Sequence, residues 1–117
     1  MIIPPEEVIE NIKQYALLPL LLSVFEKDRK LIYSSGIKTM EPYVSLMEQT
    51  IKRVEEDLNE TKRYFYKNGV KVYEEERTSD GIQLKYLYRG YQHTANYPLE
   101  NQKGPFILLM KKYLGVE

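Results

Sequence analysis

The chain has 117 residues, with 17 basic and 17 acidic side chains, one histidine and no cysteine. This length fits a single domain, and a composition of 43% hydrophobic and 29% charged residues is that of a globular protein. The absence of cysteine excludes disulfide frameworks, thiolate metal sites and thiol nucleophiles.

The first predicted element is a long helix over about residues 5–33. Pro5 followed by Glu6 is typical of a first helical turn, because proline tolerates this position and acids face the positive end of the helix dipole. Pro19 lies in the middle and has no N–H to donate, so it either kinks this helix or divides it. The apolar run at residues 16–25 is shorter than the roughly 20 residues of a membrane span, so we expect a buried core helix.

The second predicted helix covers about residues 40–68 and carries an apolar stripe with heptad spacing. Its members are alternately four and three residues apart: Met40, Val44, Met47, Ile51, Val54, Leu58, Thr61 and Phe65. Such a stripe packs against a neighbouring helix at a shallow angle. The short connection at residues 34–38 favours antiparallel packing on the first helix, although the stripe could also form a seam between two chains.

After Gly69 the apolar period changes from helical to alternating, which predicts a β-hairpin over about residues 70–89. Its turn is assigned to residues 79–81, and a loop of that length places Val72 opposite Tyr88. We expect alternate apolar residues to share one face that packs on the helices: Val70, Val72, Ile82, Leu84, Tyr86 and Tyr88.

The rest of the chain is predicted to be a loop over residues 90–104 and a C-terminal helix over about residues 105–114, opened by Pro105. The whole chain, residues 1–117, is therefore expected to form one domain. Its predicted class is α+β and mainly helical, with two long antiparallel helices, a β-hairpin and a C-terminal helix.

Residues that could carry chemistry are sparse. His93 is the single histidine, and no local sequence pattern places a serine beside it. An enzyme with a carboxylate or Tyr–His site is therefore only the third alternative. The glutamates at residues 74–76 lie on a predicted strand, where successive side chains alternate between faces and cannot converge on one ion. The glycines lie singly at element boundaries and form no phosphate-binding loop. We therefore predict no catalytic residue, no metal site and no cofactor, and a protein that is not an enzyme.

Tyrosine is unusually frequent, with eleven in the chain, and in the second half it alternates with basic residues. Because tyrosine and arginine anchor protein interfaces, we predict a surface that binds another protein or a second copy at Tyr73, Arg89, Tyr91 and Tyr97. The same region could instead bind DNA through stacking and through phosphate contacts from Lys62, Arg63, Lys67, Lys71, Lys85 and Arg89. Ordinary half-buried tyrosines are the third possibility.

The stretches LLPLLLSVFEKDRK at residues 17–30 and YRGY at residues 88–91, with the general pattern of the chain, resemble short uncharacterised proteins of Bacillus-type bacteria and their phages. The resemblance implies a small cytoplasmic protein and brings no functional residues with it. The start of the chain also lacks the basic region of a secretory signal. We expect a cytoplasmic, non-enzymatic interaction protein with a regulatory or accessory role, with a DNA-binding or transcription-accessory protein as the alternative.

Overall fold

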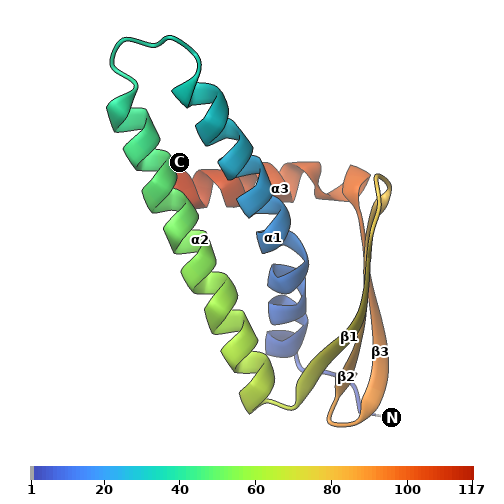
Figure 1. Cartoon of the computed structure of the whole chain (residues 1–117). Helices are drawn as coiled ribbons and strands as arrows, with labels where there is room; N and C mark the ends of the chain where they lie inside the picture. Colours follow the sequence, from blue (N-terminus) through green and yellow to red (C-terminus); the bar gives the residue numbers. More distant parts are fainter. Residues whose placement is uncertain (1) are drawn as a thin grey trace.

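The computed structural model describes residues 2–117, which form three α-helices and three β-strands (Figure 1). The α1–α2 helical hairpin stands beside an antiparallel sheet of strand order β1-β2-β3, and α3 crosses the hairpin (Figure 1). This confirms the predicted α+β, mainly helical class. The elements in chain order are α1 (Glu6–Tyr33), α2 (Glu41–Lys67), β1 (Val70–Arg77), β2 (Gly81–Tyr88), β3 (Tyr91–Pro98) and α3 (Leu99–Leu114).

The heptad stripe of α2 packs within the chain, largely against α1. None of its eight members is exposed, and five are buried: Met47, Ile51, Val54, Thr61 and Phe65. The one polar member is satisfied, because the Thr61 hydroxyl donates to Oε1 of Gln14 on α1 at 3.1 Å. The internal packing that the sequence favoured is confirmed, and a stripe covered in this way is not free to form a seam between chains.

The helix α1 continues through Pro19 and changes direction in its middle, so the proline kinks the helix without dividing it (Figure 1). Because proline has no N–H, the carbonyl of Tyr15 loses its helical partner. Arg77, the last residue of β1, supplies the donors: its Nη1 donates to the Ala16 carbonyl at 2.8 Å and its Nη2 to the Tyr15 carbonyl at 3.3 Å. The kink therefore ties the sheet to α1.

The prediction of a loop over residues 90–104 is wrong. A two-residue turn, Arg89-Gly90, leads into β3, which pairs with β2 along its whole length. Sequence pattern hid this strand because it has no Val, Ile, Leu or Phe, and its two tyrosines and Thr94 lie among polar residues, Ala95 and Pro98. Its helix-facing residues alternate with exposed ones, but they are only half-buried, whereas those of β2 are fully buried.

The predicted apolar face of the sheet is confirmed, but the predicted register is wrong, because Val72 lies opposite Tyr86. The β1–β2 turn is closed one residue earlier than expected, by a bond from the Thr78 N–H to the Gly81 carbonyl at 3.0 Å. A bulge between Val72 and Glu74 adds a second one-residue shift. Since two such shifts restore the side-chain alternation, the apolar residues keep the expected face.

The helix α3 begins six residues before its predicted start and includes Pro105. Its far end docks on α2 through the buried Tyr113, whose hydroxyl donates to Oδ2 of Asp57 at 2.6 Å and whose carbonyl accepts from Nη2 of Arg53 at 2.8 Å. The core accordingly has two parts, one between α1 and the sheet and one among the three helices.

Candidate functional site

The four residues predicted to bind a partner lie at three separate places on the sheet. Arg89 and Tyr91 share the β2–β3 turn and are both exposed. Tyr73 is exposed on β1, the opposite edge of the sheet. Tyr97 lies six positions along β3 from Tyr91, which is about 20 Å at ~3.3 Å per residue. The fold therefore brings together only Arg89 and Tyr91.

Tyr97 was expected to be exposed, and the structure corrects this. It is half-buried opposite Ile82 and packs on the core between α1 and the sheet. Burial raises the pKa of Tyr97 to about 12, and the nearby Tyr86 and Glu10 act in the same direction. Much of its surface thus serves the core and is not available to a partner.

Arg89 has an unusual backbone conformation, with φ of 49°, and Gly90 follows it with φ of 86°. Positive φ at both central residues matches the twist of the flanking strands, and Asn-Gly is the usual pair in such turns. An arginine there costs roughly 1–2 kcal/mol. Its guanidinium carbon lies 5.5 Å from the ring centroid of Tyr88, a cation–π contact at a solvent-exposed turn.

The six basic residues considered for DNA binding divide into smaller groups. Two are paired with acids: Arg63 with Glu60, and Lys85 with Glu74 at 3.1 Å. Three gather where α2 meets β1, because the Arg89 N–H donates to the Gly69 carbonyl at 2.9 Å, between the positions of Lys67 and Lys71. Lys62 stands apart, in a hollow that also contains Pro19 and Glu75.

His93 lies on the helix-facing side of β3 and stacks on Tyr86, with ring centroids 5.4 Å apart. Its Nε2 is shielded from solvent and has no hydrogen-bond partner among residues 2–117. Within the same residues no group of three His, Asp or Glu side chains is placed to hold a metal ion. The sequence prediction of a protein without catalytic or metal-binding residues stays a prediction.

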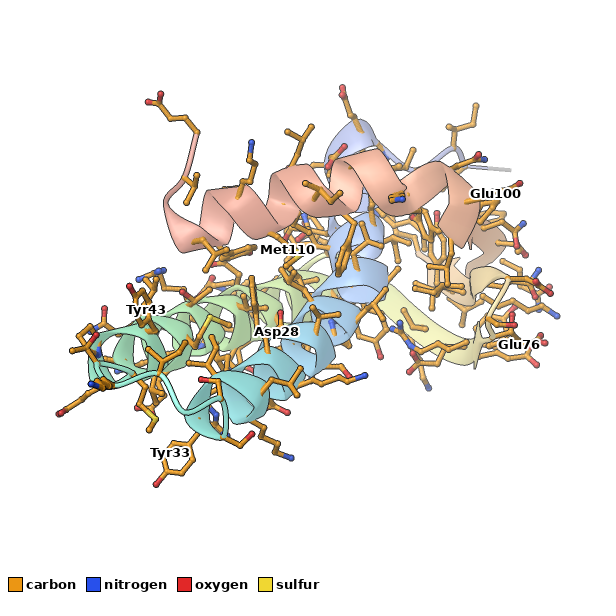
Figure 2. The ribbon with its side chains drawn as sticks, turned by 90° about the horizontal axis from the view of Figure 1, so that it is seen from above. Asp28, Tyr33, Tyr43, Glu76, Glu100 and Met110 are labelled. Atoms are coloured by element: carbon orange, nitrogen blue, oxygen red, sulfur yellow. The ribbon has the colours of Figure 1, made fainter. Side chains whose placement is uncertain are left out.

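A group of exposed apolar side chains that sequence reasoning missed lies at the free end of the α1–α2 hairpin. Figure 2 shows Tyr33 and Tyr43 at this end, on the side of the molecule away from Glu76 of the sheet. A group of exposed apolar side chains can mark a binding site where its members lie side by side. We call the group at this end the hairpin-end surface; its five members are between 41% and 68% exposed: Leu31, Tyr33, Ile37, Tyr43 and Leu46.

This surface exists because the hairpin extends beyond the rest of the fold. The core among the three helices reaches Phe25 on α1 and Met47 on α2. Closer to the α1–α2 loop the two helices have chiefly each other as partners, so apolar residues beside the heptad stripe stay exposed. The available signal was Tyr43 and Leu46, which directly precede two stripe positions and add apolar surface outside the seam.

A hollow of about 320 Å³ opens between α1 and α2 at this end, lined by Arg29, Lys30, Tyr33, Val44 and Glu48. Its lining combines two apolar side chains with charges of both signs. Such a combination can accept an apolar side chain and orient it through the charged rim.

Comparison with known proteins gives one family and one relative. Residues 3–117 match the family model described as "YhjD protein". A protein of Bacillus subtilis (strain 168), named "Uncharacterized protein YhjD", is 26% identical over 92 residues, which cover 79% of this chain and 77% of the relative. No solved structure matches. These findings confirm the expected link to an uncharacterised family of Bacillus-type bacteria, and the phage part of that expectation stays a prediction.

Proposed function

The chain belongs to the YhjD protein family, and we propose that it is a non-enzymatic interaction protein, regulatory or accessory in role, that binds another protein through the hairpin-end surface. The observation that carries this proposal is the presence of five exposed, large apolar side chains at the free end of a projecting pair of helices. Covering apolar surface contributes about 25 cal/mol for each Å² removed from water, so a partner that covers this end gains directly.

The chemistry of the hairpin-end surface suits a protein partner. Tyr33 and Tyr43 offer large rings at a small entropic cost, with hydroxyls that stay hydrogen-bonded at the edge of an interface. The hollow beside Tyr33, between Lys30 and Glu48, supplies a recess with polar edges. Aromatic anchors next to a recess are the usual sites at which binding energy concentrates.

The experiment compares two matched variants, Tyr33→Glu and Leu108→Glu. Both side chains are 68% exposed, Tyr33 at the hairpin end and Leu108 on the outer side of α3, so each substitution adds one charge at little cost to the fold. Partners are captured from lysate of the source bacterium, quantified by mass spectrometry, and the main one is purified for a direct binding assay. We expect binding to survive in Leu108→Glu and to fall at least tenfold in Tyr33→Glu. Equal binding by both variants contradicts this surface.

The second candidate function is DNA binding, and one observation favours it: Lys67, Lys71 and Arg89 gather at the α2–β1 junction. Phosphate contacts release counterions, so binding of this kind weakens steeply as salt rises. The test is a titration of duplex and single-stranded DNA at about 50 mM salt, with Lys71→Glu as the variant. A shift that Lys71→Glu abolishes supports this function, and no shift at tens of micromolar protein removes it.

We also propose a cytoplasmic location. In the described part of the chain α1 is long and apolar enough, by length and composition alone, to cross a membrane. The support for a water-soluble state is that its most apolar residues are used elsewhere: Leu17, Leu18, Leu21 and Phe25 are buried against α2, α3 and the sheet. Fractionation of cells that express the tagged chain tests this, because a membrane protein would sediment with the membranes.

A further inference from the structure

The two edges of the sheet are built differently. Five of the eight residues of β1 are charged, and the strand carries a bulge between Val72 and Glu74. Charges and bulges are the common devices that keep a strand edge from pairing with another chain. The other edge strand, β3, has no Asp, Glu, Lys or Arg in its eight residues and pairs with β2 without any irregularity. One edge is protected and the other is not.

The hydrogen-bonding pattern shows which backbone groups of β3 point away from the sheet. The Arg89 N–H donates to the Gly69 carbonyl, so the odd-numbered residues of β2 point towards β1 and the even-numbered ones towards β3. Those even-numbered residues pair with Tyr91, His93, Ala95 and Tyr97. The outward N–H and carbonyl groups therefore belong to Gln92, Thr94 and Asn96, which are all exposed and have no backbone partner within residues 2–117.

This outward edge is complementary to itself. When two copies of β3 run antiparallel about a two-fold axis at Thr94, Gln92 of each copy lies opposite Asn96 of the other, and Thr94 lies opposite Thr94. All three pairs are then of the hydrogen-bonded type, which gives six backbone bonds. Threonine pairs are favourable, and a Gln–Asn pair already bridges two strands in this sheet, where Gln83 donates to Asn96 at 2.9 Å.

Charge makes a second copy of the chain the suitable occupant. Self-pairing places each residue opposite a residue of the same strand, so any charge near the axis would face a like charge and oppose assembly. β3 has no such charge, whereas β1 carries three adjacent glutamates at 74–76. On the helix-facing side, the same register places Tyr91 opposite Tyr97 and His93 opposite Ala95, and three of these four are only half-buried within one chain.

We propose that two copies of this chain join through β3 to form a continuous six-stranded sheet with its two-fold axis at Thr94. This interface is separate from the hairpin-end surface, so a failure of either proposal leaves the other standing. Pro98 has no N–H to donate, so the hydrogen-bonded pairing ends before it and is limited to Gln92, Thr94 and Asn96. The hairpin ends of the two copies remain free for another partner.

The test is the mass of the full chain in solution, measured by light scattering after gel filtration and by sedimentation. Thr94→Lys and Thr94→Glu each place two like charges opposite one another at the axis, on the solvent-facing side of the sheet. Glu76→Gln is the control, because it changes the net charge by the same amount as Thr94→Lys on the same face of the sheet, but on β1, the edge away from the proposed interface. We expect the wild type and Glu76→Gln to be dimers at about 100 µM, a concentration at which a micromolar dissociation constant gives mostly dimer.

Each Thr94 variant alone should raise the dimer dissociation constant at least tenfold, and an equimolar mixture of the two should restore the dimer, because lysine then faces glutamate. Hydrogen exchange should show the amides of Gln92, Thr94 and Asn96 becoming protected as the concentration rises. A monomeric wild type overturns the proposal, and so does a wild-type dimer that Thr94→Lys leaves intact. Failure of the mixture to reassemble overturns the register.

Discussion

Arg77 compensates for Pro19, and removing this compensation gives the sharpest test of the fold. The guanidinium donates to the carbonyls of Tyr15 and Ala16 at the kink of α1. Arg77→Met keeps most of the apolar stem of the side chain and deletes its donors. Pro19→Ala gives the helix its own N–H for the Tyr15 carbonyl, so the two residues should be energetically coupled.

The expected magnitude follows from the geometry. A hydrogen bond to a charged donor contributes about 1.5–3 kcal/mol, and the partial exposure of Arg77, together with the long 3.3 Å bond to Tyr15, places the pair of bonds at the lower end. We expect Arg77→Met to lower the free energy of unfolding by about 2 kcal/mol. In the Pro19→Ala background the cost should fall to about 1 kcal/mol, because the Tyr15 carbonyl then has a helical donor and only the Ala16 bond is lost.

The assay is urea unfolding of the wild type, the two single variants and the double variant, followed by far-ultraviolet circular dichroism. The coupling energy is the difference between the cost of Arg77→Met in the two backgrounds, and we expect about 1 kcal/mol. Equal costs within about 0.3 kcal/mol would refute the reasoning, since they would mean that Arg77 does not substitute for the donor that Pro19 lacks.

Three further predictions follow from single contacts. Arg89→Asn should raise the free energy of unfolding by about 0.5–1 kcal/mol, because asparagine tolerates the left-handed conformation better; a loss of stability in urea unfolding would contradict this. Tyr113→Phe should lower stability by about 1 kcal/mol, seen as a fall in Tm of about 4 °C, because the hydroxyl bond to Asp57 is lost. The third concerns high pH: burial raises the pKa of Tyr97 to about 12, and burial and the bond to Asp57 raise that of Tyr113, so both keep their protons in the folded state above pH 10. The unfolded chain releases them near pH 10, so the contribution of these two tyrosines to stability should be constant below pH 10 and fall as pH rises towards 12, and stability should fall less steeply in Tyr113→Phe.

Features that depend on neighbouring residues in the sequence were predictable. The heptad spacing from Met40 to Phe65 indicated a helix, its apolar face and its packing on α1, and the covered stripe confirms all three. The alternation after Gly69 indicated two strands and the face that they bury. These patterns work because a side chain's direction follows directly from its position in a helix or strand.

Features that depend on distant partners were not predictable. β3 is a strand because β2 offers it a full ladder, and its own composition contributes little. The link from Arg77 to α1 joins residues about sixty positions apart, and no local pattern marks it. The hairpin-end surface depends on where α3 crosses the hairpin, and the bond from Tyr113 to Asp57 helps to set that position. Each is a property of the assembled fold.

Two positions depart from local preference, and their surroundings give them different meanings. Pro19 removes a hydrogen-bond donor from α1, but Arg77 supplies donors in its place. These bonds also attach the sheet to α1. Arg89 adopts a left-handed conformation that asparagine would adopt at lower cost, and its guanidinium makes a cation–π contact, at 5.5 Å, with the ring of its buried neighbour Tyr88. Backbone strain that no contact within the fold offsets is commonly found at functional sites. If Arg89→Asn is more stable than the wild type, the contact with Tyr88 does not offset the backbone cost, and the stability of the fold does not explain an arginine at this turn.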